Sequence, residues 1–162
     1  MANIGELQRL RDTMVGALHA IEGNDEQRVL ERFGELASLP NGALRTAVSE
    51  LAMANEQMLG QLCGARDDTL TCLELLDDDG DDVDIDTLEP ALRAAVRMLL
   101  ALRNGRPDDA MTQLDVVQAA GDPAELGVVL FYLLMWSEQF ITLCQAVGKP
   151  TPDWLRPDAT GH

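Results

Sequence analysis

The stretch Leu126-Gly-Val-Val-Leu-Phe-Tyr-Leu-Leu-Met-Trp136 holds eleven residues without a charge, and the rest of the chain has to fold around it. The preceding Asp122-Pro123-Ala124-Glu125 is typical of a helix start, with a capping aspartate and a proline at the first helical position. Gly148 and Pro150 are typical of a helix end. The pattern predicts one helix over 124–147, ~36 Å long at about 1.5 Å per residue. Because its first three turns have no polar face, we expect them to be buried on every side, by this chain or by a second copy.

A membrane span is the alternative explanation for such an apolar helix. A bilayer requires about 20 consecutive apolar residues. Here Ser137, Glu138 and Gln139 interrupt the run after eleven. We therefore expect a helix in a protein core or interface, and no membrane partner.

Composition favours a single all-α domain. A chain of 162 residues is long enough to bury its own core, and 46% of its residues are apolar but only 4% aromatic. Ala and Leu dominate, which suits close-packed helices better than a sheet.

The three cysteines, Cys63, Cys72 and Cys144, lie in apolar helical patterns. We expect them to be reduced core residues rather than members of disulfides or zinc ligands. With no secretory signal at the first residues, we expect a cytoplasmic protein.

Helical periodicity and capping signals place four helices in the first half, at about 3–23, 24–39, 41–64 and 67–76. Asn3 with Glu6 is expected to cap the first and Asn24 the second. The predicted buried face of the second helix consists of Val29, Leu30, Phe33, Leu36 and Ala37.

Asn55 occupies a core position in the heptad pattern of the third helix, between Leu51 and Met58. A buried Asn at such a position typically fixes helix register or oligomeric state at some cost in stability. The alternative is that Asn55 lies at the rim of the helix interface. The sequence leaves both open.

The second half repeats the order of a long, a shorter and a long helix. Asp86 or Thr87 is expected to cap a helix that ends at Asn104-Gly105, and Pro107 to begin the next. We predict a bundle of six to seven helices in one domain over 1–162, with similar halves at 1–76 and 87–148, an acidic linker at 77–86 and an extended tail at 149–162. Trp154 and Leu155 are the expected apolar anchors of this tail.

The acidic segment carries the only concentrated chemistry, with nine acidic residues among the sixteen from Glu74 to Glu89 and no base. A calcium loop starting at Asp78 fails because Gly80 and Val83 occupy its third and sixth positions. The spacing Asp77-Asp78-x-x-Asp81 is that of a magnesium diphosphate site, yet no second such motif follows. The remaining interpretations are a solvated linker or a docking surface for a basic partner. The candidate partner-binding residues are Asp77, Asp78, Asp79, Asp81, Asp82, Asp84 and Asp86.

Residues for catalysis and cofactor binding are sparse. The histidines are His19, expected to be half-buried at the surface, and the terminal His162. No serine lies in a Gly-x-Ser-x-Gly turn and no Gly-rich phosphate loop occurs. We therefore expect no catalytic residues, no metal site and no cofactor. The net charge of −16 also argues against nucleic acid as a partner.

These observations predict a non-enzymatic protein-interaction or regulatory protein, of the adaptor, chaperone or immunity type, that binds a basic or helical partner and forms a homodimer through its central or first helix. The alternative from another class is a small-ligand or lipid-binding bundle. Its candidate pocket residues are Phe131, Tyr132, Met135, Trp136, Glu138 and Phe140. A metal-dependent enzyme that uses the Asp-rich run is the third and weakest prediction.

Overall fold

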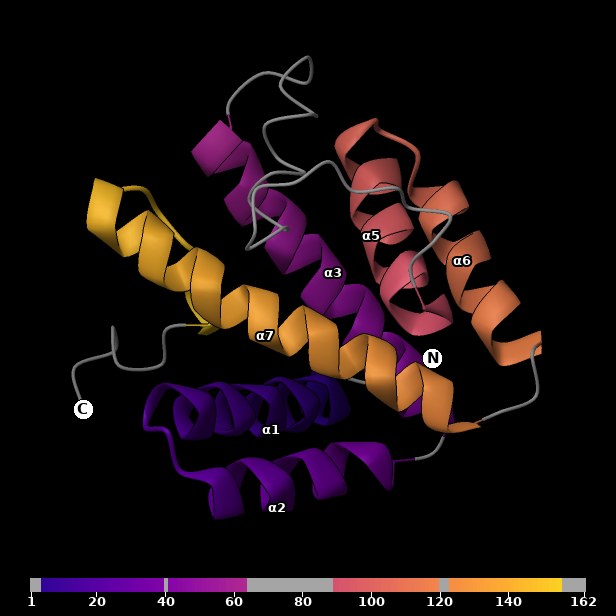
Figure 1. The fold of residues 1–162 in the computed structure, drawn as a ribbon, viewed down its shortest axis with the longest axis horizontal. Helices are drawn as coiled ribbons and strands as arrows, with labels where there is room; N and C mark the ends of the chain where they lie inside the picture. Colours follow the sequence, from indigo (N-terminus) through magenta and orange to yellow (C-terminus); the bar gives the residue numbers. More distant parts are fainter. Residues whose placement is uncertain (1–3, 40, 64–88, 120–122, 156–162) are drawn as a thin grey trace.

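The computed structural model describes residues 4–39, 41–63, 89–119 and 123–155 (Figure 1). Within these ranges the chain forms six α-helices and a short 3₁₀ turn, with no β-strand. The helices are α1 (Ile4–Glu22), α2 (Glu26–Ala37), α3 (Asn41–Cys63), α5 (Pro90–Arg103), α6 (Pro107–Ala119) and α7 (Pro123–Val147), and the 3₁₀ turn is η3 (Asp153–Leu155). The predicted all-α bundle is confirmed. The predicted helix at 67–76 and the acidic linker lie outside the described residues.

Two long helices, α3 and α7, pack against each other at the centre of the bundle. The hairpin of α1 and α2 lies on one side of this pair and the hairpin of α5 and α6 on the other (Figure 1). α3 also packs on α5, and α7 packs on both α1 and α5. Each half of the chain therefore contributes one hairpin and one central helix. A duplication of the two halves stays a prediction.

The central apolar stretch lies in α7, which begins at Pro123 as its capping signals predict. Its core side is closed, because Val129, Leu130, Leu133 and Phe140 are fully buried. Burial on every side was nevertheless too strong an expectation for this single chain, since Phe131 keeps 36% of its surface exposed.

By length and composition alone, the segment Glu125–Val147 of α7 would be able to cross a membrane, with a mean hydropathy of 1.6. In the structure, 56% of the most apolar 18-residue stretch of this segment is buried inside the protein. The core helix of a soluble bundle passes the same test of length and hydropathy.

Two predicted helix caps are wrong. α2 is capped by Asp25, whose Oδ1 accepts a hydrogen bond of 3.2 Å from the backbone N–H of Arg28. Asn24 instead adopts a left-handed backbone conformation, with φ of 56°, in the turn after α1. Asn tolerates this conformation better than most residues, which frees the next position for the cap. For α5 the residue at the cap is Glu89, whose side chain makes no capping hydrogen bond, rather than Asp86 or Thr87.

A small polar cluster lies at the crossing of α3 and α7. Asn55 has no exposed surface, and its Nδ2 donates to the backbone oxygen of Leu133 at 3.0 Å. The Ser137 hydroxyl lies 2.6 Å from Oδ1 of Asn55 and 2.8 Å from the same Leu133 oxygen. The rim alternative for Asn55 is therefore wrong. Its hydrogen bonds join the two central helices of one chain.

The segment after α7 folds back onto the bundle. Leu155 is buried, and Trp154 is partly buried with its ring 5.1 Å from the guanidinium carbon of Arg11. Both predicted anchors of the tail therefore contact the helices. The anchoring residues form the short turn η3 within a segment that was expected to be wholly extended.

Candidate functional site: an apolar groove between α1, α2 and α7

The outer side of α2 carries the most exposed large apolar side chain among the described residues. Val29, Phe33 and Leu36 lie on the side of α2 that packs inward, and Leu36 is fully buried. Leu30 follows Val29 and so lies about 100° further round the helix. It is 71% exposed. The prediction that Leu30 belongs to the buried face is wrong, because α1 and α7 cover only part of the apolar arc of α2.

Leu30 lies at the edge of a concavity of about 320 Å³, which we call the apolar groove. The end of α1, the first half of α2 and the middle of α7 form its walls. Its lining residues are Ile21, Asn24, Glu26, Val29, Leu30, Phe131 and Met135. Five of these seven are apolar, and the two polar ones belong to the turn between α1 and α2 and to the start of α2.

α2 and α7 contact each other through an aromatic pair. The rings of Phe33 and Phe131 are 5.6 Å apart and nearly perpendicular, in the edge-to-face arrangement that aromatic rings prefer. Phe33 also packs over Gly127, one turn before Phe131, since a Cβ at Gly127 would lie 3.9 Å from the Phe33 ring, at ordinary van der Waals distance. In Figure 1, α1 lies between α2 and most of α7, and the C-terminal end of α2 comes nearest to the start of α7. The apolar groove lies beyond the aromatic pair, where α7 no longer covers α2.

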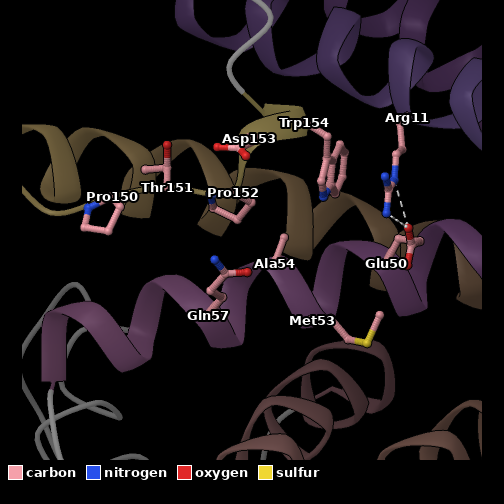
Figure 2. Close-up of a pocket in the computed structure, with 10 residues that line it drawn as sticks. All are labelled: Arg11, Glu50, Met53, Ala54, Gln57, Pro150, Thr151, Pro152, Asp153 and Trp154. Carbon is pink, nitrogen blue, oxygen red and sulfur yellow. Dashed lines mark hydrogen bonds and ion pairs between the residues drawn. The ribbon is translucent and has the colours of Figure 1, made fainter. Parts of the chain in front are cut away.

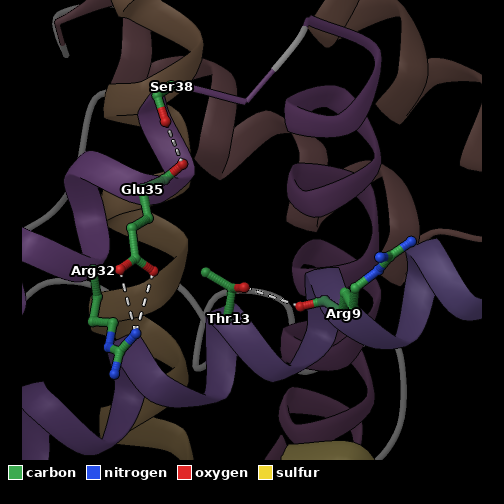
Figure 3. Close-up of polar contacts among 5 residues, drawn as sticks. All are labelled: Arg9, Thr13, Arg32, Glu35 and Ser38. Atoms are coloured by element: carbon green, nitrogen blue, oxygen red, sulfur yellow. Dashed lines mark hydrogen bonds and ion pairs between the residues drawn. The ribbon is translucent and has the colours of Figure 1, made fainter.

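The polar contacts drawn on this hairpin are local to each helix (Figure 3). Arg32 pairs with Glu35 three residues later at 3.3 Å, and the Ser38 hydroxyl donates to the Glu35 backbone oxygen at 2.9 Å. On α1, the Thr13 hydroxyl donates to the Arg9 backbone oxygen at 3.0 Å. Each of these contacts joins residues of the same helix or its C-cap, and none of them joins α2 to α7. The aromatic pair and the neighbouring apolar contacts therefore position the wall that carries Leu30.

The six predicted pocket residues do not line one pocket. Phe131 and Met135 line the apolar groove, but Phe140 is fully buried and Trp136 is 7% exposed. Tyr132 lines neither concavity described here, although its ring lies 6.1 Å from the Phe131 ring and 6.3 Å from the Trp136 ring, and its hydroxyl donates to Oε1 of Glu89. This hydrogen bond, followed by burial and the nearby carboxylates, raises the pKa of Tyr132 to about 12. Consecutive residues of a helix point about 100° apart, so one apolar run on α7 serves several separate environments.

Glu138 lines neither of the two concavities described here, although it follows the groove face of α7. It comes three residues after Met135, hence on the same side of the helix. Its carboxylate accepts a hydrogen bond of 3.3 Å from the Thr142 hydroxyl, and its side chain is partly exposed. Glu138 is therefore a surface carboxylate beside the groove and does not point into an apolar pocket.

A second concavity, a cleft of about 560 Å³, lies between α1, α3 and the segment 150–154 (Figure 2). Arg11 lies at one end of the cleft (Figure 2), with Nε at 2.9 Å and Nη2 at 2.5 Å from Oε1 of Glu50. The hydroxyl of Thr151 in its wall is buried and has no hydrogen-bond partner among the described residues. The sequence patterns did not predict this cleft, because its walls come from three segments far apart in the chain.

The residues described by the structure include no group of three or more His, Cys, Asp or Glu side chains that is able to hold a metal ion. The seven aspartates of the predicted partner-binding run, 77–79, 81, 82, 84 and 86, lie outside the described residues. His19 is exposed rather than half-buried. Cys144 is a free, buried thiol, and burial raises its pKa, as expected of a core cysteine.

Sequence reasoning missed most of the groove lining, namely Ile21, Asn24, Glu26, Val29 and Leu30. One signal for it was present, because Val29 and Leu30 are adjacent and one helix face of ordinary width rarely buries both. The role of the groove has to be inferred from its own chemistry, because no known protein family, no curated protein and no solved structure matches this chain.

Proposed function

We propose that this chain is a non-enzymatic protein-interaction protein and that the apolar groove is its docking site. The observation that carries the proposal is the 71% exposure of Leu30 at the edge of a concavity that is lined mainly by apolar side chains. An isolated apolar residue on a surface needs no explanation, but several around one hollow are typical of a binding surface.

The composition of the groove supports a protein partner. Phe131 supplies an aromatic side chain held in place by Phe33, and rigid aromatic anchors are enriched among residues that dominate binding energy. Met135 adds an adaptable side chain to the same wall. The walls are helices, so the groove suits the docking of apolar side chains from a partner helix.

The test is site-specific photo-crosslinking in cells that naturally produce the protein. A crosslinker replaces Leu30 in one variant and Val116 in the control, because Val116 is 59% exposed on α6, away from the groove. We expect a discrete crosslinked protein from position 30, lost when Phe131→Asp is added, and none from position 116. Equal products at both positions, or none at position 30, would overturn the proposal. Circular dichroism checks that each variant remains folded.

The second candidate function is small-ligand binding in the cleft between α1, α3 and the segment 150–154. It is favoured by the cleft volume of about 560 Å³, within the usual range for ligand sites, and by the buried Thr151 hydroxyl. Screening small molecules for thermal stabilisation that is lost in Trp154→Ala tests this function. The homodimer and the docking of a basic partner on the Asp-rich run stay predictions.

A further inference from the structure

We propose that the partner segment in the apolar groove is a basic amphipathic helix, whose apolar side chains enter the groove while its Lys or Arg side chains meet Glu26 and Glu138. This inference rests on the proposed function of the groove and names the chemistry of its partner.

The first reason is the charge around the turn between α1 and α2. The exposed charged residues from 22 to 31 are four carboxylates, Glu22, Asp25, Glu26 and Glu31, and one guanidinium, Arg28. No basic residue lines the groove, whereas Glu26 does. An incoming cation therefore meets a field of opposite sign on the α2 side.

The second reason is the charge on the opposite wall. Glu138 lies on the same side of α7 as Met135, and its carboxylate accepts a hydrogen bond from the neutral hydroxyl of Thr142. A carboxylate thus accompanies the apolar lining on each of the two helices that form the main walls. A helix with apolar residues three and four positions apart and flanking Lys or Arg residues complements both features.

The third reason concerns the competing occupants. A second copy of this chain carries the same net charge of −16, and a symmetric contact would place like charges from the α1–α2 turn near each other. An extended segment would find no strand edge here, because the walls are helices whose backbone hydrogen bonds are already made. A helix brings its backbone groups already paired and only needs to bury its apolar face.

The experiment uses three synthetic peptides and the full chain. One peptide has leucines at helical spacing and lysines on the remaining face, the second has glutamine in place of each lysine, and the third scrambles the lysine peptide so that no apolar face forms. Binding is followed by NMR shifts of the groove residues at low and at physiological salt. We expect the lysine peptide to bind at the groove more tightly than the glutamine peptide, with a difference that shrinks as salt is added. The scrambled peptide should not shift the groove residues.

Two variants locate the effect. Glu26→Gln with Glu138→Gln should weaken the lysine peptide about fivefold at low salt, as expected for two exposed ion pairs, and leave the glutamine peptide within about twofold. The matched control, Asp108→Asn with Asp109→Asn on α6, removes the same charge away from the groove and should leave both affinities nearly unchanged. Leu30→Asp should abolish binding of both peptides.

The outcomes separate this inference from the function on which it rests. If the lysine and glutamine peptides bind equally, or the control variant weakens binding as much as the Glu26 and Glu138 variant, the basic partner is wrong while the groove remains a docking site. If light scattering finds a dimer that Leu30→Asp dissociates, the occupant is a second copy and the inference is overturned. If neither the lysine nor the glutamine peptide shifts the NMR signals of the groove residues, and Leu30→Asp gives the same result as the unmodified chain, the apolar groove is not a docking site.

Discussion

α7 has two sides that reverse the usual placement of polar and apolar groups. Where it crosses α3, the polar Asn55 and Ser137 are fully buried. Where it faces α2, the apolar Phe131 and Leu30 are 36% and 71% exposed. The buried polar groups have found hydrogen-bond partners, so their burial costs little. The exposed apolar groups are covered only in part by the chain itself, so the first side is complete within the chain and the second is not.

The largest expected effect comes from the two phenylalanines of α7. Phe140→Ala should lower the free energy of unfolding by about 3–5 kcal/mol, because Phe140 is fully buried and its removal leaves a cavity. Phe131→Ala should cost about 1–2 kcal/mol, because part of its ring already faces water and its ring contacts with Phe33 and Tyr132 are lost. Urea unfolding measures both. Equal losses would mean that the α2 side of α7 is as closed as its core side.

The polar crossing should show the next largest effect. Asn55→Ala should destabilise the chain by about 2–3 kcal/mol, because a buried hydrogen bond to Leu133 is lost and the Ser137 hydroxyl loses a partner. Ser137→Ala should cost about 1 kcal/mol. The double variant should be less destabilised than the sum of the two, with a coupling of about 1 kcal/mol. Strict additivity in urea unfolding would show that the two side chains do not act together.

The sequence predicted the helices well because their ends are determined by residues close to each end. Pro107 and Pro123 begin α6 and α7, and Asn104 with Gly105 ends α5, since caps and prolines act within a few residues. The apolar run of α7 also predicted the central helix, because eleven uncharged residues have few other places in a folded chain.

The candidate site was not predicted, because it depends on contacts between distant segments. Whether Leu30 is covered depends on where α7 leaves α2, and that is set by the pairing of Phe33 with Phe131, nearly a hundred residues later. Asn55 likewise is buried only because Leu133 and Ser137 supply partners across the α3–α7 crossing. Periodicity identifies which residues share a helix face, but it does not identify which part of that face a neighbour covers.

The smallest expected effect concerns the pKa of Tyr132 on α7. Tyr132 follows Phe131 directly but makes a polar contact, in which its hydroxyl donates to Glu89 and its pKa is raised to about 12. Because this raised pKa favours the protonated phenol in the folded state, its contribution to stability is complete below pH ~10, the unfolded value, and is lost as the pH rises toward 12.

Tyr132 is the single tyrosine of the chain, so tyrosinate absorbance during an alkaline titration reports on this group alone. In Glu89→Gln the pKa should fall toward the ordinary value near 10, because the carboxylate that accepts the phenolic proton and repels the phenolate is gone. Circular dichroism recorded at each pH ensures that the titrating chain is still folded. An unchanged pKa in Glu89→Gln would show that the contact with Glu89 does not hold the Tyr132 hydroxyl in the folded chain. Tyr132 would then belong, with Phe131, to the exposed side of α7.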